Sequence, residues 1–399
     1  MKKVVIAYSG GLDTSYCAKS LSNEGFEVHA VSVNTGGFSK EEVQKIGDNA
    51  KKIGATTYKN IDAVSSFYTK VVKYLIFGNV LKNNTYPLSV SAERIVQAIE
   101  IINYAKEIGA KYIAHGSTGA GNDQVRFDMI FQIIAPEIEI ITPIRDKQLS
   151  RQEEIDYLKE NGVEMNWEKS KYSVNKGLWG TSVGGAETLT SNEPLPESAF
   201  PSQLSEKEIG KISLSFTKGE LTAINDKENS PENNIQILEE IAKKYAIGRD
   251  IHVGDTIIGI KGRVGFEAAA ASIIIKSHHL LEKHTLSKWQ LQHKDYVANW
   301  YGTHLHEGQY LDPVMRDFEA LLQSSQERVT GKVFVSLHPY RFVLDGISSA
   351  YDLMNSNFGN YGAQDIGTKL KYAINEAFGF GMGGPGSDDG SVSLSGTYG

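Results

Sequence analysis

Short apolar stretches alternate with longer amphipathic stretches over the first 150 residues of the chain. Runs such as residues 4–8 and 27–33 are typical of buried strands, whereas Ile95, Ile99 and Ile102 recur at helical spacing. Glycines at positions 25, 54 and 109 end predicted helices. The pattern predicts strands over 4–8, 27–33, 57–61, 112–114 and 138–141, and helices over 13–23, 39–53, 64–77, 91–108 and 123–134.

This alternation favours an α/β fold with a parallel, Rossmann-like sheet that is covered by helices on both faces. Such sheets bind ligands beyond the carboxyl ends of their strands. The loops that follow the predicted strands are therefore where we expect the chemistry of the protein to lie.

The pattern changes after about residue 163, which indicates a second, α+β domain. Residues 212–223 and 251–275 are predicted to be rich in strands, with a helix over 235–245 between them and a hairpin over 332–343. Residues 192–205 hold three prolines and are predicted to be a surface linker or excursion. We predict domains over 1–163 and 164–360, followed at 361–399 by a C-terminal helix and a mobile glycine-rich tail.

Composition narrows the classes of function. The chain has 399 residues and a formal charge of −7, which disfavours a broad nucleic-acid-binding surface. Its one cysteine, Cys17, excludes an intramolecular disulfide and a CxxC redox pair. No apolar run approaches the length of a membrane span, which is about 20 residues. We expect a cytoplasmic protein with no membrane partner.

A glycine-rich loop directly after the first strand is the clearest sign of chemistry. It reads Ser9-Gly10-Gly11-Leu12-Asp13-Thr14-Ser15 and leads into a predicted helix. The helix start and the hydroxyl groups would form a phosphate cradle, and Asp13 could help to hold a magnesium ion. The loop is not a Walker A motif, because no lysine lies in the turn. Its plainer interpretation is a strand–helix turn with a helix cap.

The segment SGGLDTS resembles the signature of the N-type ATP pyrophosphatases, the PP-loop superfamily. Residues 115–127, HGSTGAGNDQVRF, and residues 86–91, YPLSVS, resemble the argininosuccinate synthase family within it. The resemblance implies an adenine nucleotide alpha-hydrolase-like domain and a synthetase domain. It also implies an enzyme of arginine biosynthesis that joins L-citrulline to L-aspartate, cleaves ATP to AMP and pyrophosphate with Mg²⁺, and forms a homotetramer through its C-terminal helix.

The resemblance also assigns site residues to this chain, motif by motif. ATP would be held by Ala7, Tyr8, Ser9, Gly10, Gly11, Leu12, Asp13, Thr14, Ser15 and Gly116. Aspartate would be bound by Thr118, Asn122 and Asp123, and citrulline by Tyr86, Ser91, Asn122, Arg126, Ser173 and Ser182. Asp13 and Asp123 would be the catalytic carboxylates, with Asp123 orienting the aspartate ammonium or binding magnesium.

The chain departs from the family pattern at several positions. Ala120 replaces a basic residue, and Ala92-Glu93-Arg94-Ile95 stands where the family reads LARP. Gly254 and Phe266 occupy positions that in the family hold a glutamate and a tyrosine that reach citrulline. A shift by one residue would let Asp255 supply the missing carboxylate.

Two alternatives remain open from the sequence. One is another PP-loop enzyme acting on a different amino or amide substrate, and the other is a nucleotide-binding sensor without catalysis. The resemblance favours adenylation of the citrulline ureido oxygen followed by attack of the aspartate amine. That scheme requires no protein nucleophile, which fits a chain with a single cysteine.

Overall fold

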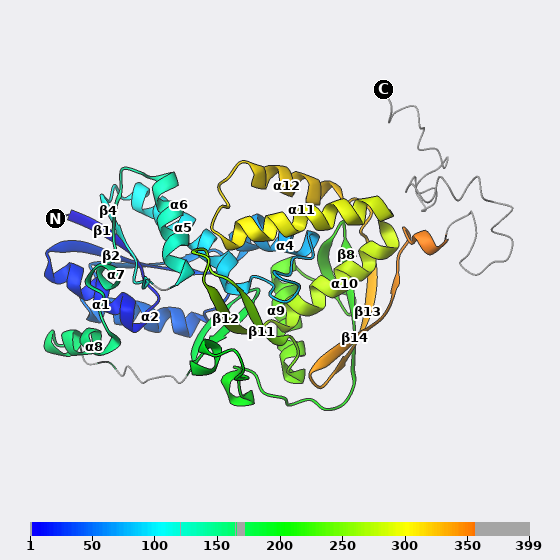
Figure 1. The fold of residues 1–399 in the computed structure, drawn as a ribbon, viewed down its shortest axis with the longest axis horizontal. Coiled ribbons are helices and arrows are strands. Elements are labelled where there is room, and N and C mark those ends of the chain that lie inside the picture. Colours follow the sequence, from blue (N-terminus) through cyan, green and yellow to red (C-terminus); the bar gives the residue numbers. More distant parts are fainter. Residues whose placement is uncertain (1, 120, 164, 166–171, 356–399) are drawn as a thin grey trace, which may run out of the picture.

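The computed structural model describes residues 2–119, 121–163, 165 and 172–355 of the chain. A parallel five-stranded sheet with the order β3-β2-β1-β4-β5 forms its N-terminal part (Figure 1). The strands of this sheet are β1 (Lys2–Ala7), β2 (Phe26–Asn34), β3 (Thr57–Asp62), β4 (Tyr112–Ala114) and β5 (Glu139–Ile141). Each lies within two residues of the bounds that the apolar pattern predicts.

Helices cover both faces of this sheet because its strands alternate between two hydrophobic clusters. Val4 and Ile6 pack on the side of α1, whereas Val5 faces the other side, where α5 lies. The helices of this half are α1 (Leu12–Asn23), α2 (Lys40–Lys52), α3 (Val64–Phe67), the π-helical turn η1 (Tyr68–Val72), α4 (Lys73–Phe77), α5 (Ser89–Glu107), α6 (Asn122–Ile134), α7 (Pro143–Lys147) and α8 (Arg151–Glu160). The predicted α/β fold is confirmed.

Two antiparallel sheets form the second half. One has the order β10-β9-β8-β13-β14, and the other has the order β11-β12-β7-β6. Their strands are β6 (Ser173–Gly177), β7 (Gly180–Gly184), β8 (Gly210–Thr217), β9 (Glu220–Ile224), β10 (Lys227–Glu228), β11 (Arg249–Asp255), β12 (Lys261–Glu267), β13 (Gly331–His338) and β14 (Arg341–Ser348). The predicted hairpin near the C-terminus is present as β13 and β14.

Helices in the second half were only partly predicted. They are the 3₁₀ turns η2 (Ala186–Leu189), η3 (Glu197–Ala199), η4 (Lys243–Tyr245) and η5 (Leu353–Asn355), and the helices α9 (Pro231–Ala242), α10 (Ala269–Thr285), α11 (Lys288–His306) and α12 (Val314–Ser324). The strand-rich prediction for 251–275 is wrong beyond Glu267, because α10 begins there. Residues 273–275 are three consecutive buried isoleucines, and such a run suits a buried helix as well as a strand.

The proline-containing segment 192–205, which the sequence predicts to be a surface linker or excursion, packs on its neighbours. Leu195 and Ala199 are buried in a small cluster with Tyr172 and Val183. The segment therefore packs on the sheet β11-β12-β7-β6.

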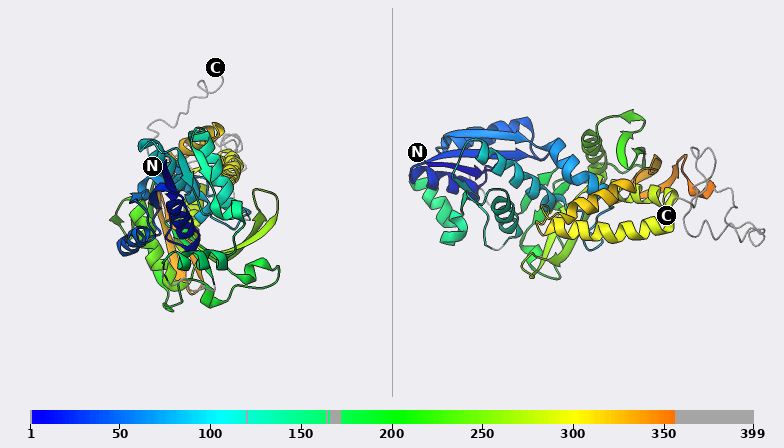
Figure 2. Two further views of the ribbon diagram at one scale, coloured as in Figure 1. Left: turned by 90° about the vertical axis from the view of Figure 1, so that its left-hand side faces the viewer. Right: turned by 90° about the horizontal axis from the view of Figure 1, so that it is seen from above.

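Helix α5 joins the two halves. It packs against β1 and β2 of the parallel sheet and also against β6 and β7 of the second half. Figure 2 shows the parallel sheet at one end of an elongated molecule and the β13–β14 hairpin toward the other. In the described part of the chain, no helix is both long and apolar enough to cross a bilayer. The predicted C-terminal helix and tail, at 361–399, lie outside the described residues.

Candidate active site

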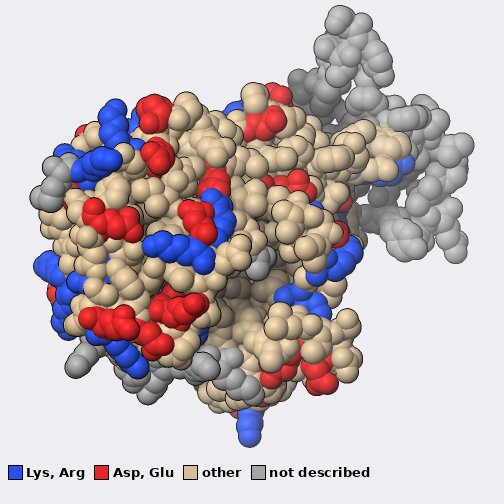
Figure 3. Space-filling model, turned by 60° about the vertical axis from the view of Figure 1, so that its left-hand side comes forward, with Lys and Arg blue, Asp and Glu red and all other residues tan. Residues whose placement is uncertain are grey.

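A cavity of about 910 Å³ lies between the carboxyl end of the parallel sheet and the sheet β11-β12-β7-β6. The loops after β1 and β4 and the first turns of α5 and α6 line it on one side. A hollow is visible in the space-filling view, where acidic and basic side chains alternate over the surrounding surface (Figure 3). The cavity lies where an open parallel sheet is expected to bind its ligand.

The loop between β1 and α1 presents groups that could donate hydrogen bonds to an anion. Gly10 has φ +78°, which glycine adopts without strain and which turns the chain sharply into the helix. Gly11 caps α1 without any side-chain hydrogen bond, so backbone N–H groups of the first turn stay available to a ligand. The Ser9 hydroxyl accepts a hydrogen bond from Gly11 N at 3.3 Å and lies 3.3 Å from Thr14 Oγ1. These groups lie together as the motif predicts, and they could bind a phosphate group.

The loop after β4 packs directly on the loop between β1 and α1. A methyl group at Gly116 would come within 3.1 Å of the Asp13 carbonyl carbon and 3.2 Å of Thr14 N. Buried His115 fixes this loop, because its Nδ1 accepts a hydrogen bond from Ser117 N at 3.2 Å. The His115 proton therefore lies on Nε2, which donates to Asp128 Oδ1 at 2.9 Å.

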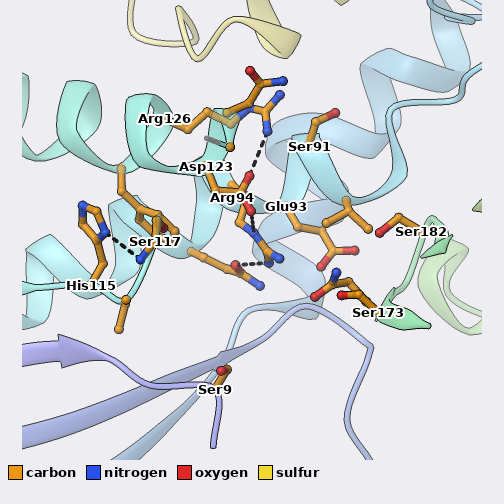
Figure 4. A pocket seen from close by; sticks show the side chains of 18 of the residues that line it. Ser9, Ser91, Glu93, Arg94, His115, Ser117, Asp123, Arg126, Ser173 and Ser182 are labelled. Atoms are coloured by element: carbon orange, nitrogen blue, oxygen red, sulfur yellow. Dashed lines mark hydrogen bonds and ion pairs between the residues drawn. The ribbon is translucent and has the colours of Figure 1, made fainter. Parts of the chain in front are cut away.

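Asp123, in the first turn of α6, is held between two arginines (Figure 4). Its Oδ2 accepts from Arg94 Nε at 2.9 Å, and its Oδ1 accepts from Arg126 at 2.9 Å. Burial would raise the pKa of Asp123, but the two guanidinium charges outweigh it and hold that pKa below its usual value. Asp123 is thus ionised at neutral pH and positions two arginines at the cavity wall.

Arg126 is buried, and two of its nitrogens also donate to the carbonyl oxygen of His306, at 3.0 and 2.8 Å. His306 and His252 line the same cavity, and burial lowers the pKa of both, that of His306 to about 3. Both imidazoles are therefore neutral at physiological pH. The positive charge on this side of the cavity comes from arginines, which suit the carboxylates of amino acids.

One face of the sheet β11-β12-β7-β6 closes the cavity. Ser182 lies opposite Asn175 and Phe266, and Ser173 is two residues from Asn175, so these side chains share one face. Tyr86 packs against the same face, stacked on His252 with ring centroids 5.2 Å apart. The predicted citrulline residues therefore converge from α5, from the preceding loop, from the first turns of α6 and from this sheet.

Asp255, the proposed replacement for the family glutamate, lines the cavity, and its contact with citrulline stays a prediction. Gly254 pairs with Gly262, and Asp255 pairs with Lys261 at the end of the two strands. The Asp255 carboxylate is exposed and forms an ion pair with Lys261 at 2.7 Å. The His252 ring occupies the space that a side chain at position 254 would fill.

Most residues that the motifs predict come together around the cavity. The exceptions are Gly10, which lies beneath the loop beside Ile46, and Ser15, whose buried hydroxyl lies 3.3 Å from Tyr8 Oη. The predicted residues that line the cavity are Ala7, Tyr8, Ser9, Gly11, Leu12, Asp13, Thr14, Tyr86, Ser91, Gly116, Thr118, Asn122, Asp123, Arg126, Ser173 and Ser182.

Sequence reasoning missed several other lining residues. They are Glu93, Arg94, Gln97, Lys176, His252, Arg263 and His306. The departure from LARP at positions 92–95 is the available signal for Glu93, whereas Arg94 keeps the arginine of that pattern. The others lie within α5, on strands or at the end of α11, where packing decides which way their side chains point.

The donor set suits a magnesium ion that arrives with nucleotide phosphates. Mg²⁺ usually keeps several waters and binds one or two carboxylates together with substrate phosphates. Asp13 lines the cavity at the predicted phosphate cradle and could supply such a carboxylate. Among the described residues, no group of three or more His, Cys, Asp or Glu could hold a metal on its own.

Comparisons with known proteins match nearly the whole chain. Residues 3–164 match the family model "Arginosuccinate synthase N-terminal HUP domain", and residues 172–380 match "Arginosuccinate synthase C-terminal domain". The argininosuccinate synthase of Methanocaldococcus jannaschii is 36% identical over 369 residues, which is 92% of this chain and 93% of that protein. The one from Dictyoglomus turgidum is 36% identical, covering 90% and 91% of the two chains. The one from Xanthomonas campestris is 33% identical and covers 95% of each.

Proposed function

Since the chain belongs to the argininosuccinate synthase family, we propose here how its cavity carries out the family's reaction. The protein is a ligase of arginine biosynthesis that joins citrulline to aspartate, with ATP as a further substrate. The resemblance drawn from the sequence motifs is thereby confirmed. The division of roles among the cavity residues is our proposal.

We propose that ATP is cleaved to AMP and pyrophosphate and that its outer phosphates lie on the loop from Ser9 to Ser15. The observation that carries this proposal is the uncapped start of α1 behind Gly10 and Gly11, with the Ser9 and Thr14 hydroxyls beside it. Such a cradle holds pyrophosphate as a unit and contains no lysine for γ-phosphate transfer. Mg²⁺, held by the phosphates and Asp13, would neutralise part of their charge.

Citrulline and aspartate would occupy the rest of the cavity. The citrulline ureido oxygen attacks the α-phosphorus, pyrophosphate leaves, and the aspartate amine then displaces AMP from the activated carbon. Arg94 and Arg126, held by Asp123, present positive charge to substrate carboxylates. Thr118 and the uncapped start of α6 would meet aspartate, while Tyr86, Ser91, Ser173 and Ser182 would meet citrulline. Catalysis would then come from positioning and charge stabilisation.

Isotope transfer tests the adenylation step. Citrulline labelled with oxygen-18 in its ureido group should yield labelled AMP, together with one pyrophosphate for each argininosuccinate formed. Formation of ADP and inorganic phosphate, or AMP without the label, would contradict the mechanism. Omitting aspartate and then citrulline provides the controls, because steady turnover should require both amino acids.

The assembly and cellular address are also part of the proposal. We propose a homotetramer in the cytoplasm, supported by the family membership and by the single, buried Cys17, which suits a reducing compartment. Light scattering coupled to size-exclusion chromatography measures the mass of the assembly directly. A mass of one or two chains at micromolar concentration would contradict the tetramer.

A further inference from the structure

Glu93 is a buried carboxyl with half of its hydrogen-bonding capacity unused. It lies in α5, and only 1% of its surface is exposed. Its Oε2 accepts a hydrogen bond from Thr35 Oγ1 at 2.8 Å, whereas Oε1 has no partner. Buried polar atoms are nearly always paired, so an orphan oxygen in a cavity wall points to a ligand.

The surroundings of Glu93 place this oxygen at the predicted citrulline residues. Figure 4 shows its carboxyl pointing toward Ser173 and Ser182 across the cavity. Gly177, at the end of β6, makes room for it, because a methyl group at that position would overlap Glu93 Oε1. The Glu93 carboxyl group therefore packs closely against the hairpin β6–β7.

The other carboxyl groups of the cavity are either paired with basic side chains or lie away from the predicted citrulline residues. Asp123 is paired with two arginines through both oxygens, and Asp255 is exposed and paired with Lys261. Asp13 lies in the phosphate loop. Among the described residues of the sheet β11-β12-β7-β6, Asp255 is the carboxylate that lines the cavity, and its pairing with Lys261 leaves the serines and His252 beside Glu93 without a carboxylate of their own. Glu93 is therefore the carboxyl that a cationic group bound beside these serines would meet.

We propose that Glu93 binds the α-ammonium group of citrulline through its free Oε1. This inference rests on the proposed placement of citrulline beside Ser173 and Ser182. An ammonium group buried next to serine hydroxyls needs a carboxylate to replace its lost hydration, and an ionised pair with hydrogen bonds meets that need.

The charge state of Glu93 is consistent with an arriving cation. Burial raises its pKa to about 8, against the opposing effects of Arg94 and the Thr35 hydrogen bond, while Asp123 raises it further. In the empty cavity at neutral pH the carboxyl is mostly protonated. The substrate ammonium takes the place of that proton, which goes to solvent.

Removing the amine from the substrate tests the contact directly. The probes are citrulline and 5-ureidopentanoate, which lacks only the α-amine, and the variant is Glu93→Gln, which can still accept from Thr35. Wild-type enzyme should favour citrulline by tenfold or more in kcat/KM. In Glu93→Gln the KM for citrulline should rise at least tenfold, while the KM for ATP should stay within twofold. The ratio of kcat/KM for citrulline to kcat/KM for 5-ureidopentanoate should fall to about 1.

Two more variants separate binding from structure. Thr35→Val removes the hydrogen bond to Oε2 but leaves Oε1, so it should keep the wild-type preference for citrulline. Gly177→Ala crowds Oε1 from the opposite side and should reduce the preference as Glu93→Gln does, which provides a second route if that variant does not fold. An unchanged preference in Glu93→Gln or in folded Gly177→Ala would overturn the assignment of Glu93. If wild-type enzyme fails to turn over citrulline and aspartate, the proposed function fails instead.

Discussion

At the scale of single residues, glycines determine how closely the two loops of the cavity approach each other. Gly116 is the clearest case, since the atoms that a methyl group would meet are the backbone of Asp13 and Thr14. Backbone atoms of a helix start cannot move aside as a flexible side chain can. The phosphate loop and the loop after β4 therefore form one rigid unit.

We expect Gly116→Ala to displace this unit and lower kcat/KM for ATP by up to about 100-fold, the cost of an error of about 1 Å in position. Steady-state kinetics with varied ATP measures the effect. Gly184→Ala is the matched control, because nothing lies within 4 Å of its added methyl group and its φ is not positive. Equal losses in both variants would contradict the role of Gly116.

Glu93 should leave a signature in the pH dependence of stability. Folding raises its pKa from 4.5 to about 8, mainly by burial, so the protonated carboxyl favours the folded state. That contribution is complete below pH 4.5 and is lost as the pH rises through 8. Glu93→Gln does not titrate. Without substrates, its free energy of unfolding relative to wild type should therefore improve between pH 5 and pH 8, by an amount on the order of a few kcal/mol.

Urea unfolding of both proteins at several pH values measures this difference. Glu154 and Glu239, whose pKa values burial also raises, titrate in both proteins and cancel in the comparison. A gap between variant and wild type that does not change with pH would show that Glu93 has an ordinary pKa.

The residues of the site could be predicted from the sequence where a local motif carries them. Ser9 and Thr14 follow from a loop that needs no tertiary information, because strand, turn and helix are adjacent in the chain. Glu93 could not be predicted in this way. An acidic residue on a helix usually faces solvent, and here its burial depends on Thr35 and Gly177, from distant segments.

At the scale of elements, a buried polar network links three segments of the second half to Asn79, which follows α4. Lys294 of α11 pairs with Glu282 of α10 at 2.9 Å, and both side chains are fully buried. Gln326, after α12, also donates to Glu282, and His278 bonds to both Gln326 and Asn79. Burial would raise the pKa of Glu282, but His278 and Lys294 outweigh it and keep the carboxylate charged.

We expect Lys294→Met to destabilise the protein by about 3–5 kcal/mol, because it leaves the Glu282 carboxylate buried without its cation. Chemical denaturation at pH 7 measures the loss. Lys218→Met is the control, since Lys218 pairs with Glu327 at the exposed surface, where an ion pair contributes little to stability. A loss below 1 kcal/mol for Lys294→Met would mean that the network is dispensable.

Elements were predictable where the local pattern and the tertiary structure agree. Helix α2 has a complete capping box between Ser39 and Glu42, and its predicted start is correct. Helix α10 is different. Helix α10 is buried on many sides, so it lacks the polar face that marks a surface helix, and its isoleucine run reads equally as a strand.

At the scale of the whole molecule, the two halves share one hydrophobic core. The larger cluster runs from Val5 of the parallel sheet through α5 to Val333 of β13. Polar contacts add to it: Trp179 Nε1 donates to Pro87 O at 3.0 Å, and Ile257 N donates to Asn122 Oδ1 at 3.0 Å. The cavity lies along this shared boundary.

We therefore expect thermal unfolding without substrates to be a single cooperative transition. Calorimetry should give matching calorimetric and van't Hoff enthalpies, and probes in either half should report the same midpoint. ATP binds the folded state, so added ATP should raise the midpoint of thermal unfolding, and probes in both halves should report the same shift. Two resolved transitions, or a shift confined to the half with the phosphate loop, would contradict the prediction.

The position of α5 has a consequence for how the chain can be divided. Its first turns line the cavity and contact β6 and β7, while the helix as a whole also packs on the parallel sheet. A single backbone cut between residues 163 and 172 would therefore yield two fragments that each expose apolar surface belonging to the other. Such fragments should remain associated and complement each other, because each covers apolar surface that the other would otherwise expose to water.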